Sequence, residues 1–279
     1  MSTTNPIASH YSSEDALARI DQQLRAQGID PEHPTLDALA PFDNFHARGM
    51  AATVDLMSLA EFPAGARVLD VGGGLGGPAR VLAARSGAHV TVLDLTPTFV
   101  MQGRVLTERV GLSDLVDFEE GDGTAMPFAD ASFDGVWTQH STMNIADKDA
   151  LYTEIHRVLT PGGRLAMHEV MLGNGEAVDY PMPWASDPRY SFLRPAEEMR
   201  NLISAHGFRE LAWIDESQKV LAFIDRGQGS TPGERSGPSQ QPPGAMILFG
   251  PAFVERIQNV GRNLASGRIT VVQGVFERV

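Results

Sequence analysis

The sequence predicts an α/β protein whose mostly parallel sheet is covered by helices on both faces. From residue 67 onward, short β-rich runs alternate with segments whose apolar residues follow helical spacing. Parallel strands are joined by crossovers that are usually helices, so this alternation is typical of such a sheet. The first β-rich run, 67–71, passes directly into glycines, and Pro78 then stands in the first turn of a helix. A strand, a glycine turn and a helix in this order suit a nucleotide-like ligand.

The other elements are placed by β-propensity, helical spacing and capping residues. We expect Thr96 and Asp147 to cap helices, and 161–163 to form a turn. We expect Pro31 and Pro34 to keep the segment that follows Gly28 from being helical. The expected strands are 67–71, 88–95, 115–119, 132–138, 164–170, 208–214 and 268–276. The expected helices cover 13–27, 52–59, 97–110, 147–159, 195–206, 219–226 and 249–265, besides the one that begins near Pro78.

This pattern divides the chain into four parts. We expect an N-terminal helical cap at 1–62, an α/β core at 63–217, an insertion at 218–266 and a last strand of the core sheet at 267–279. Within the insertion, residues 227–244 are rich in Gly, Pro, Ser and Gln and predict a flexible segment.

Composition restricts the class of partner. Lys and Arg number 22 against 35 Asp and Glu, a formal charge of −13, which argues against nucleic acid and against an anionic membrane surface. Cysteine is absent, so disulfides, thiolate metal sites and a cysteine nucleophile are excluded. No stretch resembles a signal peptide, and no apolar window approaches the ~20 residues of a membrane span. We therefore expect a cytoplasmic protein without membrane insertion.

The glycines and two acids mark the expected ligand site. Gly72, Gly74 and Gly76 would let the backbone pass close under a ligand. The spacing Gly72-x-Gly74-x-x-Gly77 also fits the dinucleotide fingerprint, so the glycines are compatible with a nicotinamide or flavin dinucleotide, with S-adenosylmethionine, or with a tight turn without a ligand. Asp94 ends the second strand, 24 positions after Asp70, where a carboxylate can accept both hydroxyls of a ribose. The alternative for Asp94 is a helix cap.

Several motifs together resemble the class I S-adenosylmethionine-dependent methyltransferases, in particular the small-molecule branch that includes ubiquinone/menaquinone-type and sarcosine/dimethylglycine-type enzymes. Residues 68–76 resemble the family's first motif, with Gly73 where Cys or Ser is more usual, and 93–95 resemble its ribose-binding strand end. Residues 121–128 are similar to the segment that meets the adenine, and 133–137 and 159–165 to the entries of the fourth and fifth strands. The resemblance covers about residues 45–215.

This resemblance implies a Rossmann-like sheet of seven strands, with the last one antiparallel between the fifth and sixth. It also implies S-adenosyl-L-methionine as the cofactor. The residues that match its binding motifs, with Gln139 added by position as a contact of the donor's amino-acid end, are Asp70, Gly72, Gly73, Gly74, Asp94, Leu95, Asp122, Gly123 and Gln139.

An oxidoreductase is the main rival from another class. A short-chain dehydrogenase needs a Tyr-x-x-x-Lys pair, whereas Tyr152 is followed four positions later by His156. A third alternative is a fold relative that keeps the donor as a structural ligand and catalyses a different reaction.

Histidines near the strand ends are the candidates for catalysis. His140 follows the fourth strand, and a reference pKa of about 6.5 suits a base or an acceptor-orienting group, although it could simply pack. His168 and Glu169 end the fifth strand, and we expect both to face the same cleft, as acceptor contacts or as a structural pair. A metal site formed by these three residues is conceivable, but we expect none. Tyr11, His46 and Arg48 lie in the cap, where they could close over a ligand.

The acceptor is expected to be a small, hydrophobic molecule methylated on oxygen, nitrogen or carbon. The apolar residues that could line its pocket, or simply form core, are Met182, Trp184, Tyr190, Phe192, Met246, Phe249 and Phe253. His46, His168 and Trp184 are the candidate acceptor contacts, while Arg189 and Arg194 leave a carboxylated acceptor open. The atom methylated, the pathway and a homodimer stay open.

Overall fold

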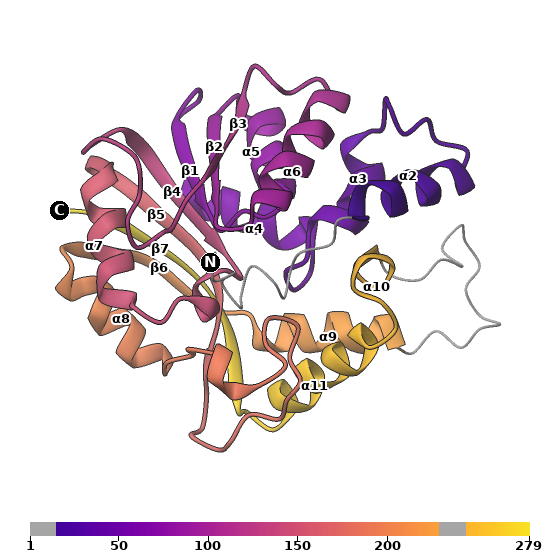
Figure 1. The fold of residues 1–279 in the computed structure, drawn as a ribbon. Coiled ribbons are helices and arrows are strands. Elements are labelled where there is room, and N and C mark those ends of the chain that lie inside the picture. Colours follow the sequence, from indigo (N-terminus) through magenta and orange to yellow (C-terminus); the bar gives the residue numbers. More distant parts are fainter. Residues whose placement is uncertain (1–14, 229–243) are drawn as a thin grey trace, which may run out of the picture.

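The computed structural model describes residues 15–228 and 244–279. Within these residues seven strands form one sheet in the order β3-β2-β1-β4-β5-β7-β6 (Figure 1). All neighbouring strands are parallel except β7, which pairs antiparallel with both β5 and β6. The strands are β1 (Arg67–Val71), β2 (His89–Asp94), β3 (Val116–Glu120), β4 (Phe133–Gln139), β5 (Leu159–Leu172), β6 (Phe208–Asp215) and β7 (Ile269–Arg278). The predicted fold class, including the place of the last strand, is confirmed.

Helices cover both faces of the sheet because its central strands are buried on both sides. On one face, Leu56 and Ala79 pack with Val92 and Trp137 in a core to which the helices α4, α5 and α6 contribute. On the other face, Leu151 and Ile203 belong to a core formed with α7 and α8 (Figure 1). The helix bounds on these two faces are α4 (Met50–Ala60), α5 (Gly77–Ser86), α6 (Pro97–Arg109), α7 (Lys148–Val158) and α8 (Ala196–Ala205).

The remaining helices surround one end of the sheet. The N-terminal helices are α2 (Ala16–Ala26) and α3 (Leu36–Asp43), and the later ones are α9 (Ser217–Gln228), α10 (Gly244–Phe249) and α11 (Phe253–Ala265). Leu248 of α10 packs with Ile20 and Leu39 from the N-terminal helices, so segments more than 200 residues apart share a core. Figure 1 shows α10 near α3, and α9 beside α11. Two short 3₁₀ turns, η1 (Thr142–Asn144) and η2 (Pro188–Tyr190), complete the fold.

Four local predictions need correction. Helix α3 forms in the segment where Pro31 and Pro34 were expected to prevent a helix. It begins after Pro34, where the Thr35 side chain accepts a hydrogen bond from the Ala38 N–H, and Pro41 lies near its C-terminal end. Residues 161–163 are not a turn after a helix but a bulge inside β5, since Phe133 pairs with Leu159 and Gly135 with Arg164.

The helix expected at 249–265 is two helices, because Gly250 adopts a positive φ of 80° between them. Thr96 stands at the N-cap of α6 without donating or accepting a capping bond through its side chain, whereas Asp147 does cap α7 by accepting from the Ala150 N–H. The predicted helix start at Ser13 and most of the flexible segment 227–244 lie outside the described residues.

Candidate functional site

A cavity of about 300 Å³ opens at the carboxyl ends of β1, β2 and β4. One end of it is formed by the glycine turn after β1 together with the ends of β2 and β3. The other end lies between α9, α11, β7 and the segment around Pro183 and Trp184. Ligands of open α/β sheets bind at this edge, so the cavity is the candidate site.

The glycine turn is held close against its surroundings. Gly72 has a φ of 73°, and a Cβ atom there would lie 2.5 Å from the Ser141 Cβ. Gly73 has no room for a side chain either, because its Cβ would lie 2.5 Å from Asp70 Oδ2. At Gly74, with a φ of 57°, a Cβ atom would meet only the Phe99 ring, at 3.8 Å. The backbone is therefore bare where it faces the cavity, as a ligand packed on main chain requires.

Two buried carboxylates flank this turn. Asp94 accepts from the backbone N–H groups of Gly74 at 2.9 Å and Thr96 at 2.8 Å, and burial raises its pKa. Burial and the neighbouring Asp94 charge raise the pKa of Asp70 to about 8. Asp70 Oδ2 is buried and bonds nothing within the described part of the chain. Both side chains line the cavity, next to Leu95.

The segment after β3 closes the same end. Asp122 Oδ1 accepts from the backbone N–H and the hydroxyl of Thr124, at 2.8 Å each, and thereby shapes the turn. Gly121, Asp122 and Gly123 line the cavity. All the residues that the sequence assigned to the cofactor thus lie around one cavity; their individual roles stay predictions.

This end of the cavity fits an adenosyl ligand that carries positive charge. The glycine turn exposes main chain on which the ligand can pack, and Asp70 Oδ2 has no hydrogen-bond partner among the described residues. Asp94 could meet the ribose hydroxyls, and Asp70 is available to the amino-acid end. A dinucleotide fits less well, since its pyrophosphate would lie among these carboxylates.

Three histidines meet in the middle of the site. The ring centroid of His140 lies 4.8 Å from that of His168 and 6.2 Å from that of His46. Burial, with a contribution from His46, lowers the pKa of His140 to about 3, and burial lowers the pKa of His46 to about 4. All three are therefore neutral near pH 7, since burial also lowers the pKa of His168. His140 lines the cavity, and its Nε2 atom has no partner among the described residues.

Gln139 holds two of these histidines. Its Nε2 lies 3.0 Å from His46 Nδ1 and 3.3 Å from His168 Nδ1, and its Oε1 accepts from Thr53 Oγ1 and Trp137 Nε1. An amide nitrogen only donates, so this arrangement assigns the proton of both neutral rings to Nε2. Gln139 borders the cavity, but both its amide atoms bond protein groups, which differs from the expected contact with the donor.

His168 and Glu169 do not face the same cleft, because neighbouring residues of a strand point to opposite faces of the sheet. His168 is fully buried behind Gln139 and does not line the cavity, so its assignment as an acceptor contact is not supported. Glu169, also fully buried, accepts from the backbone N–H groups of Ser141 and Thr142 at 3.3 to 3.4 Å, and burial raises its pKa to about 7. Its role in the structure is to hold the turn that packs on Gly72.

Arg48 lines the cavity from the cap. Its guanidinium bonds Asp55 at 2.6 Å and also bonds Glu216, which lies just before α9. Sequence reasoning named Arg48 but missed Glu216, which is 168 positions away and carries no local motif.

The apolar end of the cavity includes Trp184 and Phe253, as the sequence predicts. Met182 is fully buried core, while Tyr190 and Phe192 lie outside the cavity lining. Arg189 is exposed and paired with Asp187, and neither it nor Arg194 lines the cavity, so the proposed grip on a carboxylated acceptor is not supported. Tyr11 and the side chains of Met246 and Phe249 are outside what the structure describes.

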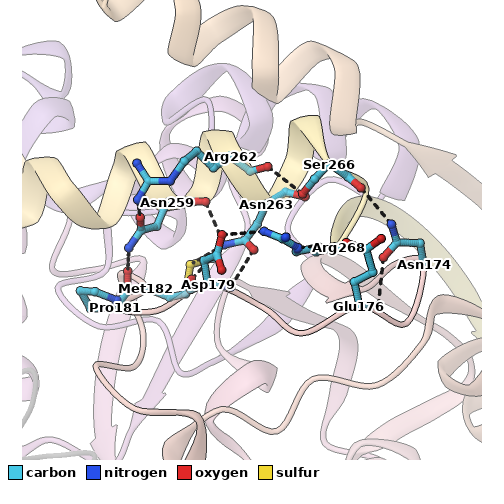
Figure 2. Close-up of polar contacts among 10 residues, drawn as sticks. All are labelled: Asn174, Glu176, Asp179, Pro181, Met182, Asn259, Arg262, Asn263, Ser266 and Arg268. Atoms are coloured by element: carbon cyan, nitrogen blue, oxygen red, sulfur yellow. Dashed lines mark hydrogen bonds and ion pairs between the residues drawn. The ribbon is translucent and has the colours of Figure 1, made fainter.

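Polar contacts on the outer side of this wall fix it in place. Asn263 Oδ1 accepts from the backbone N–H of Asp179, and its Nδ2 donates to the Asp179 carbonyl, both at 2.9 Å. Asn259 donates to the Pro181 carbonyl at 2.8 Å. Figure 2 shows these side chains, which come from α11, reaching the segment that leads to Trp184. The two parts of this wall, α11 and the segment before Trp184, are thereby joined into one unit.

Residues 69–167 match the family model described as a methyltransferase domain. Over these residues the chain is similar to methyltransferase domains. The family resemblance predicted from the motifs is confirmed. Over 108 residues the chain is 43% identical to sterol 24-C-methyltransferase ERG6B of Gibberella zeae, a match that covers 39% of this chain and 28% of that enzyme, well under two thirds of its length.

Solved structures share the fold of the methyltransferase domain at low identity. Geranyl diphosphate C-methyltransferase from Streptomyces coelicolor, in complex with Mg²⁺, geranyl-S-thiolodiphosphate and S-adenosyl-L-homocysteine, superposes with a TM-score of 0.71 at 16% identity over 100% of both chains. The [4+2]-cyclase SpnF superposes with a TM-score of 0.64 at 24% identity, over 88% of this chain and 97% of that one. At these identities the likeness concerns the fold alone. In the described parts of the chain, no helix has the length and apolarity that crossing a membrane requires.

Proposed function

We propose that this protein transfers a methyl group from S-adenosyl-L-methionine to a small molecule. The observation that carries the proposal is the division of one cavity into two ends. The end at the glycine turn holds the carboxylates of Asp70, Asp94 and Asp122, and the opposite end is apolar. A donor with positive charge and an acceptor with apolar surface would meet between them.

The donor, when bound, would supply a methyl group on a sulfonium: the acceptor atom bonds the methyl carbon in line, and the sulfur leaves with the electron pair of the broken bond as a neutral thioether. The protein's part is to align the two molecules about 3 Å apart and to exclude water. Asp94 and the turn at 72–74 would hold the adenosyl part, and Asp70 the charged amino-acid part. The buried walls around Trp184 and Phe253 keep solvent from the reacting atoms.

His140 is the candidate catalytic residue. Its ring is neutral and its Nε2 is unpartnered within the described chain, so it can accept a hydrogen bond from an acceptor hydroxyl or amine. Methyl transfer removes one positive charge from the cavity, and a proton arriving on His140 Nε2 would replace it. A ring that resists protonation in the free protein can in this way take the acceptor's proton during the reaction.

Methyl-labelled donor, incubated with the protein and a metabolite extract, tests the proposal. Label should move into a small organic product and should do so ~10²-fold more slowly with His140→Ala. Donor that binds but keeps all its label would instead assign the chain to relatives that catalyse another reaction, as the name of the cyclase SpnF illustrates.

A further inference from the structure

The acceptor end of the cavity is made of uncharged side chains. Those that line it come from the segment before η2, from α9, from α11 and from β7, and include Trp184, Val220, Ile224, Phe253, Ile257 and Val260. Among the described residues that line the whole cavity, Arg48 is the one permanent cation.

Arg48 is committed to acidic partners. Its guanidinium is 13% exposed and lies between Asp55 and Glu216. The Glu216 side chain is fully buried, and its other oxygen accepts from Lys219 Nζ at 2.7 Å. An anion that bound Arg48 would have to displace the buried Glu216 carboxylate, which would then keep only Lys219 as a partner, and this loss is unfavourable.

The arginines on the outer side of the wall are occupied as well. Arg268 pairs with Asp179 at 2.6 Å and with Glu176, and Arg262 bonds Asn259 (Figure 2). Arg256 donates to the Met182 carbonyl at 3.0 Å. None of these three lines the cavity.

The other ionisable groups that face the cavity offer no positive charge to an anion. Asp70, Asp94 and Asp122 line the donor end, and the two histidines that line the cavity, His46 and His140, are neutral at pH 7. A phosphate or carboxylate on the acceptor would lose its water there without gaining a counter-charge, which is unfavourable.

We propose that the acceptor is an uncharged, apolar molecule, and that Glu216 is a specificity-determining residue because it keeps Arg48 from pairing with anionic acceptors. This proposal rests on the proposed function and names its substrate class. It separates the protein from its structural neighbour in complex with geranyl-S-thiolodiphosphate, which is an anion.

A matched pair of probes tests the substrate class. Protein saturated with S-adenosyl-L-homocysteine is loaded with the apolar dye N-phenyl-1-naphthylamine, and the dye is displaced by geraniol or by geranyl diphosphate, which share one hydrocarbon chain. We expect geraniol to displace the dye at a concentration at least ~10-fold lower, because only the diphosphate must be desolvated without a counter-ion. Equal or tighter binding of the diphosphate would overturn the proposal.

Glu216→Gln tests the role of the ion pair. This substitution should release Arg48 and strengthen the binding of geranyl diphosphate. The displacement concentration of geranyl diphosphate divided by that of geraniol should therefore fall at least ~5-fold. Lys219→Gln removes the exposed partner of Glu216 without touching Arg48, so it should leave the ratio unchanged. Asp55→Asn frees the other side of the same guanidinium and provides a second variant if Glu216→Gln does not fold.

Stabilisation by S-adenosyl-L-homocysteine in a thermal-shift assay is measured for each variant. If the wild-type protein is not stabilised, the proposed function fails. If it is stabilised and neither Glu216→Gln nor Asp55→Asn changes the ratio, the assignment of Glu216 is wrong.

Discussion

Asp70 lies at the end of β1 with one buried carboxylate oxygen that bonds nothing in the described chain. Its pKa of about 8 keeps it protonated at neutral pH while the cavity holds no cation. A ligand with positive charge favours the ionised form, so binding should release a proton below pH 8. The residue therefore connects donor binding to pH.

We expect the affinity for S-adenosylmethionine to increase as the pH rises from 6 to 8, where Asp70 ionises on binding. Calorimetric titrations at pH 7 in two buffers with different ionisation enthalpies should show the release of up to one proton. Asp70→Asn should abolish this release. Affinity that is the same across this pH range would contradict the assignment of Asp70.

The central residues of the site were only partly predictable. Asp70, Asp94 and the glycines stand within one strand–turn–helix motif or at the end of the next strand, so a local pattern identifies them. Arg48 pairs with Glu216, 168 positions away, and Gln139 bonds His46, 93 positions away. Both contacts depend on how the cap packs on the sheet, so no local pattern predicts them. The opposite orientations of His168 and Glu169 could have been predicted, because successive side chains of a strand point to opposite faces of the sheet and the strand itself was predicted.

At the level of elements, the start of α5 is pressed against the end of α3. A Cβ atom on Gly77 would lie 2.2 Å from the Asp43 carbonyl oxygen, which belongs to the backbone and cannot rotate away. Nearby, Arg80 and Asp43 form an ion pair of 2.7 Å that is almost fully buried. The cap and the ligand-binding turn are thus joined at one point.

Gly77→Ala should lower the free energy of unfolding by roughly 1–3 kcal/mol because the backbone must shift to admit a methyl group. Urea denaturation measures the loss. Gly261→Ala is the matched control: it lies inside α11, its Cβ would have only Ile224 Cγ2 at 3.6 Å, and helix propensity should make the change stabilising by about 0.5–1 kcal/mol. The idea of a tight α3–α5 contact is wrong if the two substitutions behave alike.

The contact between α11 and the segment before Trp184 gives a second prediction for an element. Asn263→Ala removes two hydrogen bonds to the Asp179 backbone and should destabilise the protein by roughly 1–3 kcal/mol. Hydrogen exchange of residues 174–184 should become faster, whereas Arg268→Ala, which removes more exposed ion pairs, should change the exchange little. Unchanged exchange in Asn263→Ala would show that the wall is held by its apolar packing alone.

Most elements were predictable because their periodicity is local, and those that were missed depend on contacts made elsewhere. Helix α3 is short and contains Pro41, and it is stabilised by burial of Leu39 and Phe42 against the rest of the cap. The bulge within β5 follows from its pairing with β4, which no local pattern in 161–163 reveals.

For the whole molecule, buried ionisable groups make stability depend on pH in a defined direction. The folded-state pKa values of Asp70, about 8, and Glu169, about 7, lie above those of the unfolded chain. The folded protein therefore binds more protons than the unfolded chain, and stability is lost as the pH rises through these values. His46 and His140 have lowered pKa values, so they make stability increase with pH, but only below about pH 6.5, where histidines become protonated in the unfolded chain.

The free energy of unfolding of the ligand-free protein should therefore fall by roughly 2 kcal/mol between pH 6.5 and pH 8.5. Urea denaturation across this range measures the slope, and the double variant Asp70→Asn with Glu169→Gln should flatten it. Stability that stays constant over the same range would mean that these two carboxyl groups are ionised in the folded protein near neutral pH.

The topology follows from the alternation of strands and helices together with the family resemblance, and the position of the cavity follows from the topology. The walls of the acceptor end could not be predicted in the same way. They come from four segments between residues 183 and 271, and the apolar surface that they form exists only when these segments are assembled. The proposed function therefore depends most directly on the donor end of the cavity.

Calorimetric titration with S-adenosyl-L-homocysteine, compared with NAD, tests that end. We predict that each chain binds one molecule of S-adenosyl-L-homocysteine. Asp94→Asn should bind it at least ~10-fold more weakly, because charge-assisted hydrogen bonds are lost. The control Asp117→Asn, at an exposed position, should bind it as the wild-type protein does. Binding of NAD without binding of S-adenosyl-L-homocysteine would contradict the account.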